Sequence, residues 1–414
     1  MRSRRKFLKS GILASIVPYL GFKSSRHLAN KIQQFTSNNT QDLFLLNKDR
    51  HFFNTASLGA SPHQVVNAYQ EWTQKLESIS ETGHQNVKTC RNATADFLGC
   101  LSDEIAITRN TTEGINIVAQ GLQLEEGDEI ILSTHEHVGG AVPWMNVAKE
   151  KNLQLKLVDL DLSGKDNLIV LKNAVSPRTK VISLSHVTCT TGMVLPVKEL
   201  SSWCRERNII TCIDGAQAIG MIDVNLGDLQ PDFYATSGHK WLYGPKGTGF
   251  LYINKNSIDM LTPTFAGAYT TDEYNLNELN YSYLKIASRE EYGTRNTPII
   301  MSLKSAIDFH TEQGKEIIIE HGFSLARLFK SLLIDIPEVE ILSPMDEAFS
   351  SAIITFRSPI KGYKEIQQEL MKQHKCRVRG IYENELNAIR VSCAYYNTED
   401  QIRYLAAAIK EILS

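Results

Sequence analysis

One stretch, residues 232–252, constrains the fold of this chain more than any other. Residues 233–235 and 250–253 are apolar or aromatic and predict two strands. The loop between them holds four glycines, which break helices and permit positive φ. Lys240 lies in the middle of that loop, next to Trp241. A lysine held among side chains that tend to be buried would have a lowered pKa, and its amine could act as a nucleophile. Taken alone, Lys240 is better interpreted as a solvated loop residue.

A carboxylate follows a second predicted strand. Residues 209–213 are apolar, and Asp214 comes directly after them, followed by the small-residue turn that ends at Gln217. In open α/β sheets, ligands bind at the carboxyl ends of the strands. Asp214 therefore lies where a functional carboxylate is expected, although a buried aspartate that caps a helix would look the same.

Together the two segments resemble the fold-type I enzymes that depend on pyridoxal 5'-phosphate (PLP). They resemble more closely the class V aminotransferase family, which includes cysteine desulfurases, kynureninases and isopenicillin-N-epimerase-like proteins. The shared pattern is Asp-Gly-Ala-Gln from Asp214, Ser-Gly-His-Lys ending at Lys240, and Gly-Pro-x-Gly-x-Gly from Gly244. The resemblance implies an α/β fold, with a mostly parallel, seven-stranded-type sheet in a large domain and a small α+β C-terminal domain.

The resemblance also implies roles for the residues of these motifs. Lys240 would form the Schiff base with PLP. Asp214 would pair with the pyridinium nitrogen and keep it protonated, so that the ring acts as an electron sink. Gln217 would reach the ring hydroxyl, and Ser237 and His239 would contact the phosphate.

Residues 106–118 predict a strand, a turn and an apolar helix that begins near Thr111 and Thr112. Backbone N–H groups at a helix start, with hydroxyls beside them, make an anion site. Helix capping by one of these threonines, completed by Glu113 or Asn116, is the simpler interpretation and is compatible with anion binding. Because the segment resembles the phosphate turn of the family, we expect the cofactor phosphate here.

The turn after the predicted strand at 129–133 contains His135, Glu136 and His137. On a non-helical turn, with no further ligand nearby, these residues are a weak metal signal, so we expect no metal. Counting back from Pro143, His137 falls where the family has a histidine that stacks on the pyridine ring. It would lie on the face opposite Lys240.

Three further positions are assigned by the resemblance. Asn54, with Ser57 and Gly59, belongs to a segment that resembles the family's active-site mouth, although a structural turn is an equal alternative. Arg390 aligns with the arginine that binds the substrate α-carboxylate, a contact that guanidinium makes bidentately. Thr294 resembles the residue that reaches the phosphate of the neighbouring subunit, which implies a homodimer; a plain turn at the start of a helix is the alternative.

The sequence departs from the cysteine desulfurases at two places. Cys189 stands where they carry an asparagine that contacts the ring hydroxyl, and Thr188 or Thr191 could substitute for it. Residues 379–388 correspond to the loop that carries their thiol, and they contain no cysteine. Sulfur mobilisation through a persulfide is therefore disfavoured, whereas selenocysteine or cysteine lyase chemistry stays open.

We expect aminotransferase-type chemistry on an amino acid or related amine, with epimerisation of an amino-acid-containing substrate as the next choice. A PLP-fold protein that only binds its ligand is the non-enzymatic alternative. With Asp214, Gln217, His239, Lys240 and Arg390 all present, we expect an enzyme.

The N-terminus has a different character. A basic region with Arg4 and Arg5 precedes an apolar run at 11–22, which is too short to span a bilayer and resembles a twin-arginine signal. We therefore expect a periplasmic protein, delivered folded and with its cofactor by the twin-arginine export machinery, or anchored in the membrane if the signal stays uncleaved. His27-Leu28-Ala29 is a weak cleavage site.

Length and composition set the remaining limits. The 414 residues suffice for two domains, and we expect a signal at 1–26, a linker at 27–49, a PLP-binding domain at 50–314 and a C-terminal domain at 315–414. The net charge of −2 gives no indication of nucleic-acid binding. Without residues 1–26, 37 basic side chains oppose 46 acidic ones. The seven cysteines are scattered and form no CxxC motif, which argues against a zinc or thioredoxin-like site.

Overall fold

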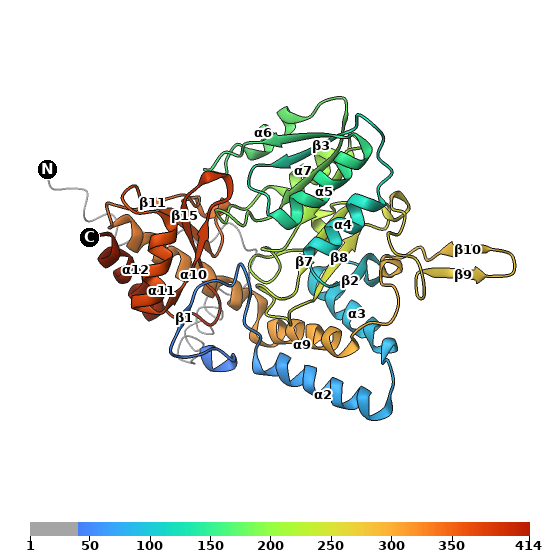
Figure 1. Cartoon of the computed structure of the whole chain (residues 1–414), viewed down its shortest axis with the longest axis horizontal. Helices are drawn as coiled ribbons and strands as arrows, with labels where there is room; N and C mark the ends of the chain where they lie inside the picture. The colour runs from blue at the N-terminus through green and yellow to red at the C-terminus, as the bar shows by residue number, and fades with distance from the viewer. Residues whose placement is uncertain (1–39) are drawn as a thin grey trace, which may run out of the picture. The chain divides into compact units, whose positions relative to one another are not determined.

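The computed structural model describes residues 40–414 of the chain (Figure 1). The predicted signal at 1–26 and most of the predicted linker lie outside the described residues. Residues 41–414 group as one unit by their contacts. The boundary between residues 314 and 315 therefore stays a prediction.

A seven-stranded sheet organises the first two thirds of the described chain. Its strands are β2 (Ile105–Thr108), β3 (Glu129–Ser133), β4 (Gln154–Val158), β5 (Thr179–Ser185), β6 (Ile210–Asp214), β7 (Phe233–Ser237) and β8 (Gly249–Ile253). They lie in the order β2-β8-β7-β6-β5-β3-β4, with β8 antiparallel to both of its neighbours and the other pairs parallel. The mostly parallel α/β sheet expected from the sequence is thus confirmed.

Helices cover both faces of this sheet. The main ones are α4 (Thr111–Gly121), α5 (Val138–Lys151), α6 (Asn167–Ala174) and α7 (Val197–Arg205). On β3, Ile130 packs in a cluster with Val118 and Trp144 from α4 and α5, whereas Ile131 packs with Leu171 and Leu200 from α6 and α7. Because side chains alternate along a strand, a strand buried on both faces must be apolar throughout.

A helical layer lies beside the sheet (Figure 1). It consists of α2 (His63–Ile79), α3 (Val87–Leu98) and α9 (Thr297–Gln313), and α9 contacts the other two. The short helix α8 (Leu226–Leu229) precedes β7. Pro62 is the N-cap of α2, with an extended ψ of 159°. The hairpin of β9 (Thr271–Asn275) and β10 (Asn280–Tyr283) extends away from the sheet in Figure 1.

The C-terminal part of the chain has its own antiparallel sheet. Its strands, in spatial order, are β11 (Glu340–Ile341), β12 (Ile353–Arg357), β15 (Ala388–Ser392) and β14 (Arg379–Ile381). The accompanying helices are α10 (Lys315–Ile334), α11 (Tyr363–His374) and α12 (Glu399–Leu413). Near the other end of the chain, β1 (His51–Phe52) pairs in parallel with β13 (Cys376–Arg377). This pairing brings the segment after β1 next to β15, where Phe53 O accepts a hydrogen bond of 2.9 Å from Ser392 N.

Two negative findings apply to residues 40–414. No helix there has both the length and the apolar character that crossing a membrane requires. Within the same residues, no group of three or more histidine, cysteine or acidic side chains is arranged to hold a metal ion.

Candidate active site

A cavity of about 460 Å³ lies at the carboxyl ends of the parallel strands, where they meet the segment after β1 and the β14–β15 pair. It is lined by Ala56, Ser57, Asn110, Thr111, Thr112, His137, Gly139, Asp214, Ala216, Gln217, Ser237, His239, Lys240, Arg379 and Arg390. The fold thus brings ten of the predicted site residues to one place, Ser57 among them. The three that it leaves outside are Asn54, Gly59 and Thr294.

Lys240 is presented by a tight turn after β7. Lys240 O accepts a hydrogen bond of 3.2 Å from Tyr243 N, and Gly244 N donates to Gly238 O at 2.7 Å. Tyr243 adopts a left-handed backbone with φ 58° while its ring is buried. Burial lowers the pKa of Lys240, and attraction to Asp214 partly offsets this effect. The direction is the one expected for an amine held among buried side chains.

Gly59 supports the lysine turn from the other side. Its N–H donates to His239 O at 2.8 Å. A Cβ at this position would lie 2.0 Å from Lys240 O, so only glycine allows the approach. The expectation that Gly59 lines the candidate site is wrong, because its backbone is committed to this contact.

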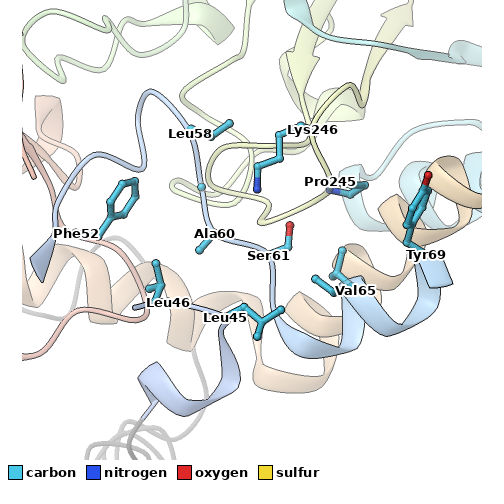
Figure 2. A pocket seen from close by; sticks show the side chains of 12 residues that line it. Leu45, Leu46, Phe52, Leu58, Ala60, Ser61, Val65, Tyr69, Pro245 and Lys246 are labelled. Atoms are coloured by element: carbon cyan, nitrogen blue, oxygen red, sulfur yellow. The ribbon is translucent and has the colours of Figure 1, made fainter. Parts of the chain in front are cut away.

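Gly59 instead lines a second cavity of about 440 Å³ (Figure 2). The walls of this cavity are mainly apolar and include Leu45, Phe52 and Val65, and the amine of Lys246 points into it. The cavity shares no lining residue with the candidate site. The segment that contains Gly59 therefore separates an apolar groove from the lysine turn.

Asp214 ends β6, on the floor of the candidate site. Its Oδ1 accepts a hydrogen bond of 2.8 Å from Ala216 N. Burial raises the pKa of Asp214, and attraction to Lys240 opposes this rise. A buried carboxylate with one backbone donor still has capacity to bind a cationic N–H group.

Gln217 is fixed by hydrogen bonds at both ends of its amide. Its Nε2 donates to Ala56 O at 2.8 Å, and its Oε1 accepts from Trp241 Nε1 at 2.8 Å. The side chain thus ties the segment after β1 to the lysine turn while it lines the cavity. Its role toward the ring hydroxyl stays a prediction.

The start of α4 forms the end of the cavity suited to an anion. The cap of α4 is Asn110, whose Oδ1 accepts from Glu113 N at 2.9 Å. The expectation that Thr111 or Thr112 caps this helix is wrong, because the helix begins at Thr111, whose hydroxyl pairs with Ser237 Oγ at 2.8 Å. Backbone N–H groups and hydroxyls at a helix start are well suited to phosphate, and here Thr111 N donates to Ser237 Oγ at 3.1 Å.

His239 and His137 are both neutral at pH 7, because burial, followed by the charge of Lys240, lowers the pKa of each to about 4. Within the described residues, His239 Nδ1 is buried with no hydrogen bond. The nearby backbone of Thr248 only partly offsets the lowering of its pKa. His137 is the N-cap of α5, where its Nδ1 accepts from Gly139 N at 3.0 Å. This bond orients the imidazole and leaves the ring proton on Nε2.

Arg390 is almost completely buried on β15, with 1% of its surface exposed. Its Nη1 donates to Cys189 O at 2.7 Å, and its Nη2 donates to Ser57 Oγ at 2.7 Å and to Asn54 Oδ1 at 3.4 Å. Its Nε has no partner among the described residues. Burial, then the charge of Arg379, lowers the pKa of Arg390 to about 10. Asn54 therefore supports the guanidinium and does not line the cavity.

Arg379 also lines the cavity. This role was not predicted from the sequence, where Arg379 is only the first residue of the segment 379–388. It pairs in register with Arg390 across β14 and β15, and it forms an ion pair with Glu383. Ser57, which binds Arg390, also lines the site. The sequence feature that pointed to Arg379 was its position shortly before the strand that carries Arg390, the arginine predicted to bind the substrate carboxylate.

Two other predicted positions lie apart from the cavity. Thr294 lines a separate cavity of about 330 Å³ together with Arg109 and Gly247. Cys189 is buried, and burial raises the pKa of its thiol to about 11, so the sulfur is protonated at neutral pH. Thr188 and Thr191 are buried and bonded to each other at 2.8 Å, so neither reaches the cavity.

Comparison with known proteins agrees with this geometry. The family model for aminotransferase class-V matches residues 51–405. The chain is 27% identical over 394 residues to a probable cysteine desulfurase of Pyrococcus abyssi, and this alignment covers 90% of this chain and 96% of the relative. It is 31% identical over 335 residues to an isopenicillin N epimerase of Amycolatopsis lactamdurans, and this alignment covers 78% of this chain and 84% of the relative.

A solved structure of a C-DES mutant, with glycine covalently linked to its PLP cofactor, superimposes with a TM-score of 0.81. It is 27% identical and covers 88% of this chain and 97% of that chain. This chain belongs to the aminotransferase class-V family, and its fold is that of the fold-type I PLP enzymes. Its cofactor is PLP.

The residues present fit this cofactor. Asp214 offers a buried acceptor, the start of α4 offers N–H donors, and His239 Nδ1 and Arg390 Nε are polar atoms without partners in the described chain. Lys240 supplies the amine. PLP, when bound, withdraws electrons from the α-carbon of an attached amino acid. The chain's own residues must then hold the substrate and move its proton.

Proposed function

We propose that this protein is a PLP-dependent enzyme that acts on an amino acid or related amine through Lys240, with aminotransferase-type chemistry. One observation carries the proposal. Lys240 is the only amine that lines the cavity among the described residues, and burial lowers its pKa. A single base of this kind suffices for transamination, because one group can take the proton from the α-carbon and deliver it to the cofactor carbon on the same face.

The remaining residues have roles that follow from their positions. Arg390 holds the substrate α-carboxylate, with its guanidinium already oriented by Ser57 and Cys189 O. Asp214 binds the ring nitrogen of the cofactor, and Thr111 and His239 bind its phosphate. His137, oriented by Gly139 N, lies against the ring and excludes water from that face.

Epimerisation is the second candidate, and the relative at 31% identity, an isopenicillin N epimerase, favours it. Inversion at the α-carbon requires an acid on the face opposite Lys240. His137 is the titratable group we assign to that face. Because its pKa is about 4, it is neutral at pH 7 and a poor proton donor. The geometry therefore favours the one-base reaction.

Persulfide chemistry has the least support. No cysteine occurs at 379–388, and Cys376 and Cys393 on either side of this segment are completely buried. Burial raises the pKa of both thiols to about 12. A desulfurase needs a reactive thiolate, which neither residue can supply at neutral pH. Lyase chemistry that needs no thiol remains a lower-ranked alternative.

An amino-acid screen in deuterated water tests the proposal. Release of a keto acid with conversion of the cofactor to its amine form supports transamination. Deuterium at the α-carbon with inverted configuration and no keto acid would replace this proposal by epimerisation. A protein that binds PLP but shows no spectral change with any amino acid would favour the non-enzymatic alternative.

We also propose that the protein is a homodimer in which Thr294 completes the phosphate site of the partner. Supporting this, Thr294 lies in a cavity of its own and not in the candidate site. Thr294→Ala should weaken PLP binding without changing the fold of the protein. A PLP-loaded monomer in sedimentation would contradict the proposal.

Finally, we propose export by the twin-arginine route, on the basis of residues 3–22, which lie outside the described part of the chain. The double change Arg4→Lys and Arg5→Lys should leave the protein in the cytoplasm. Periplasmic delivery of this variant at the wild-type level would exclude the route.

A further inference from the structure

A second carboxyl group lies beside the candidate site. Glu136 follows β3, and its Oε1 accepts a hydrogen bond of 2.5 Å from Ser133 Oγ at the end of that strand. Its Oε2 accepts one of 2.7 Å from Ser185 Oγ at the end of β5. A hydroxyl can donate or accept, so both contacts persist whether the carboxyl is ionised or protonated. The two serines fix the position of this group without fixing its charge.

This carboxyl is close to that of Asp214. Ser185 and Asp214 are partners in register on β5 and β6. A Cβ on Gly140 would lie 3.1 Å from Asp214 Oδ2 and 4.0 Å from Glu136 Oε2. These two distances place the carboxylate oxygens at most about 7 Å apart. Charges at that separation interact appreciably where little water intervenes.

The other titratable groups on the surrounding elements are neutral at pH 7. They are Cys212 on β6, Tyr234 on β7, His186 after β5, and His135 and His137 on the same turn as Glu136. Burial raises the pKa of the Cys212 thiol and of the Tyr234 hydroxyl. Burial also lowers the pKa of His135, and it lowers the pKa of His186 and of His137 to about 4. The charges that bear on this corner of the site are therefore those of Asp214 and, beyond it, Lys240.

Glu136 does not line the cavity. The residue as a whole is partly exposed, but its carboxyl is enclosed, and burial is the main reason that its pKa rises to about 7. The charge of Asp214 raises this pKa further, and the two serine hydroxyls lower it. Glu136 therefore changes its charge near neutral pH, next to the carboxyl group of Asp214 that is proposed to bind the cofactor.

We propose that Glu136 is a positioning residue that acts through Asp214: as the pH rises, it ionises and adds a second negative charge beside the ring nitrogen of PLP, which keeps that nitrogen protonated. The proposal rests on Asp214 as the partner of the ring nitrogen. A pyridine nitrogen tends to lose its proton as the pH rises. The second charge appears over the same range and opposes that loss, so the electron-withdrawing form of the ring persists to higher pH.

The test uses the PLP-loaded protein, with ¹⁵N at the ring nitrogen of the cofactor, and follows the ¹⁵N chemical shift from pH 6 to 9. In Glu136→Gln the nitrogen should lose its proton at a pH lower by about one unit than in the wild type. A unit charge at this range, with an effective dielectric constant of about 20, has an effect of that order. This readout reports protonation and does not depend on turnover.

Glu129→Gln is the matched control. Glu129 is a buried glutamate at the start of β3, and its carboxyl, like that of Glu136, accepts from two hydroxyls, Ser176 Oγ at 2.9 Å and Thr179 Oγ1 at 2.5 Å. It lies at the opposite end of the strand, away from Asp214, so its substitution should leave the ¹⁵N profile unchanged. An equal shift in both variants would show a general structural effect and overturn the proposal.

Two more variants separate the possible failures. Asp214→Asn should shift the nitrogen signal strongly; if it does not, the pairing of Asp214 with the ring is wrong. If Asp214→Asn shifts the signal and Glu136→Gln does not, the pairing stands and the role of Glu136 is refuted. Ser185→Ala removes a hydrogen bond that lowers the pKa of Glu136, so the effect should begin at higher pH. Should Glu136→Gln fail to retain PLP, an unchanged profile in Ser185→Ala overturns the proposal.

Discussion

Arg390→Lys gives the most direct test of how the site holds its substrate. The guanidinium is buried and already bound to Ser57 Oγ and Cys189 O, so it is oriented before a carboxylate arrives. Lysine keeps the charge but cannot make two parallel N–H contacts. Loss of one hydrogen bond to a charged group costs about 1.5–3 kcal/mol, which corresponds to a fall in kcat/KM of about 10- to 150-fold.

The assay compares an amino acid that the enzyme accepts with the amine that lacks its carboxylate. Arg390→Lys should reduce kcat/KM for the amino acid and leave the poor reaction of the amine nearly unchanged. Arg357→Lys, on the neighbouring strand β12, is the control, because its ion pair with Glu340 is exposed and should contribute little. Equal losses for the amino acid and the amine would refute carboxylate binding by Arg390 and indicate a structural effect.

Three further outcomes are expected. Lys240→Ala should bind PLP without a covalent link, so borohydride should no longer fix the cofactor to any peptide; retained labelling would mean that another amine is used. Asp214→Asn should lower turnover on the order of 10²-fold, because a hydrogen bond to a charged group is lost, while PLP affinity falls less. Burial lowers the pKa of Lys330 to about 8, so above that pH the unfolded chain binds more protons at this residue and stability rises with pH. The urea midpoint of the wild type should therefore rise relative to that of Lys330→Met between pH 8 and 10.5, and a constant difference between the two midpoints would contradict this.

Some elements of the fold could be predicted from the sequence because burial leaves a local signature. β3 and β7 are buried along their whole length and β6 at every residue but its first, and their apolar runs located them to within a residue or two at each end. The bounds of β4 could not be predicted in this way, because it is an edge strand with exposed side chains and α5 extends to Lys151. The β9–β10 hairpin was not predicted, since its mainly polar, exposed strands form no core.

The residues of the candidate site also divide into those that the sequence could predict and those that it could not. Asp214 and Lys240 end or follow strands of one sheet, so strand order alone brings them to one edge. The support of Arg390 by Asn54 and Ser57 could not be predicted, because these residues are separated from it by more than 300 positions in sequence. The structural role of Gly59 depends on a backbone contact with His239 that has no sequence signal.

The segment between Arg379 and Arg390 bears most directly on the reaction. In the structure it consists of β14 and a short turn in which Glu383 forms an ion pair with Arg379 at the cavity wall. A cysteine desulfurase would need a reactive thiolate here, and this chain provides a carboxylate that is already paired. All seven cysteines fall in the described residues, and burial raises the pKa of Cys189, Cys376 and Cys393 to about 11 or 12. No thiolate is available at neutral pH among these three, which supports the proposal that the chemistry of the site depends on the Lys240 amine. This favours proton transfer at the α-carbon over attack on a substrate sulfur.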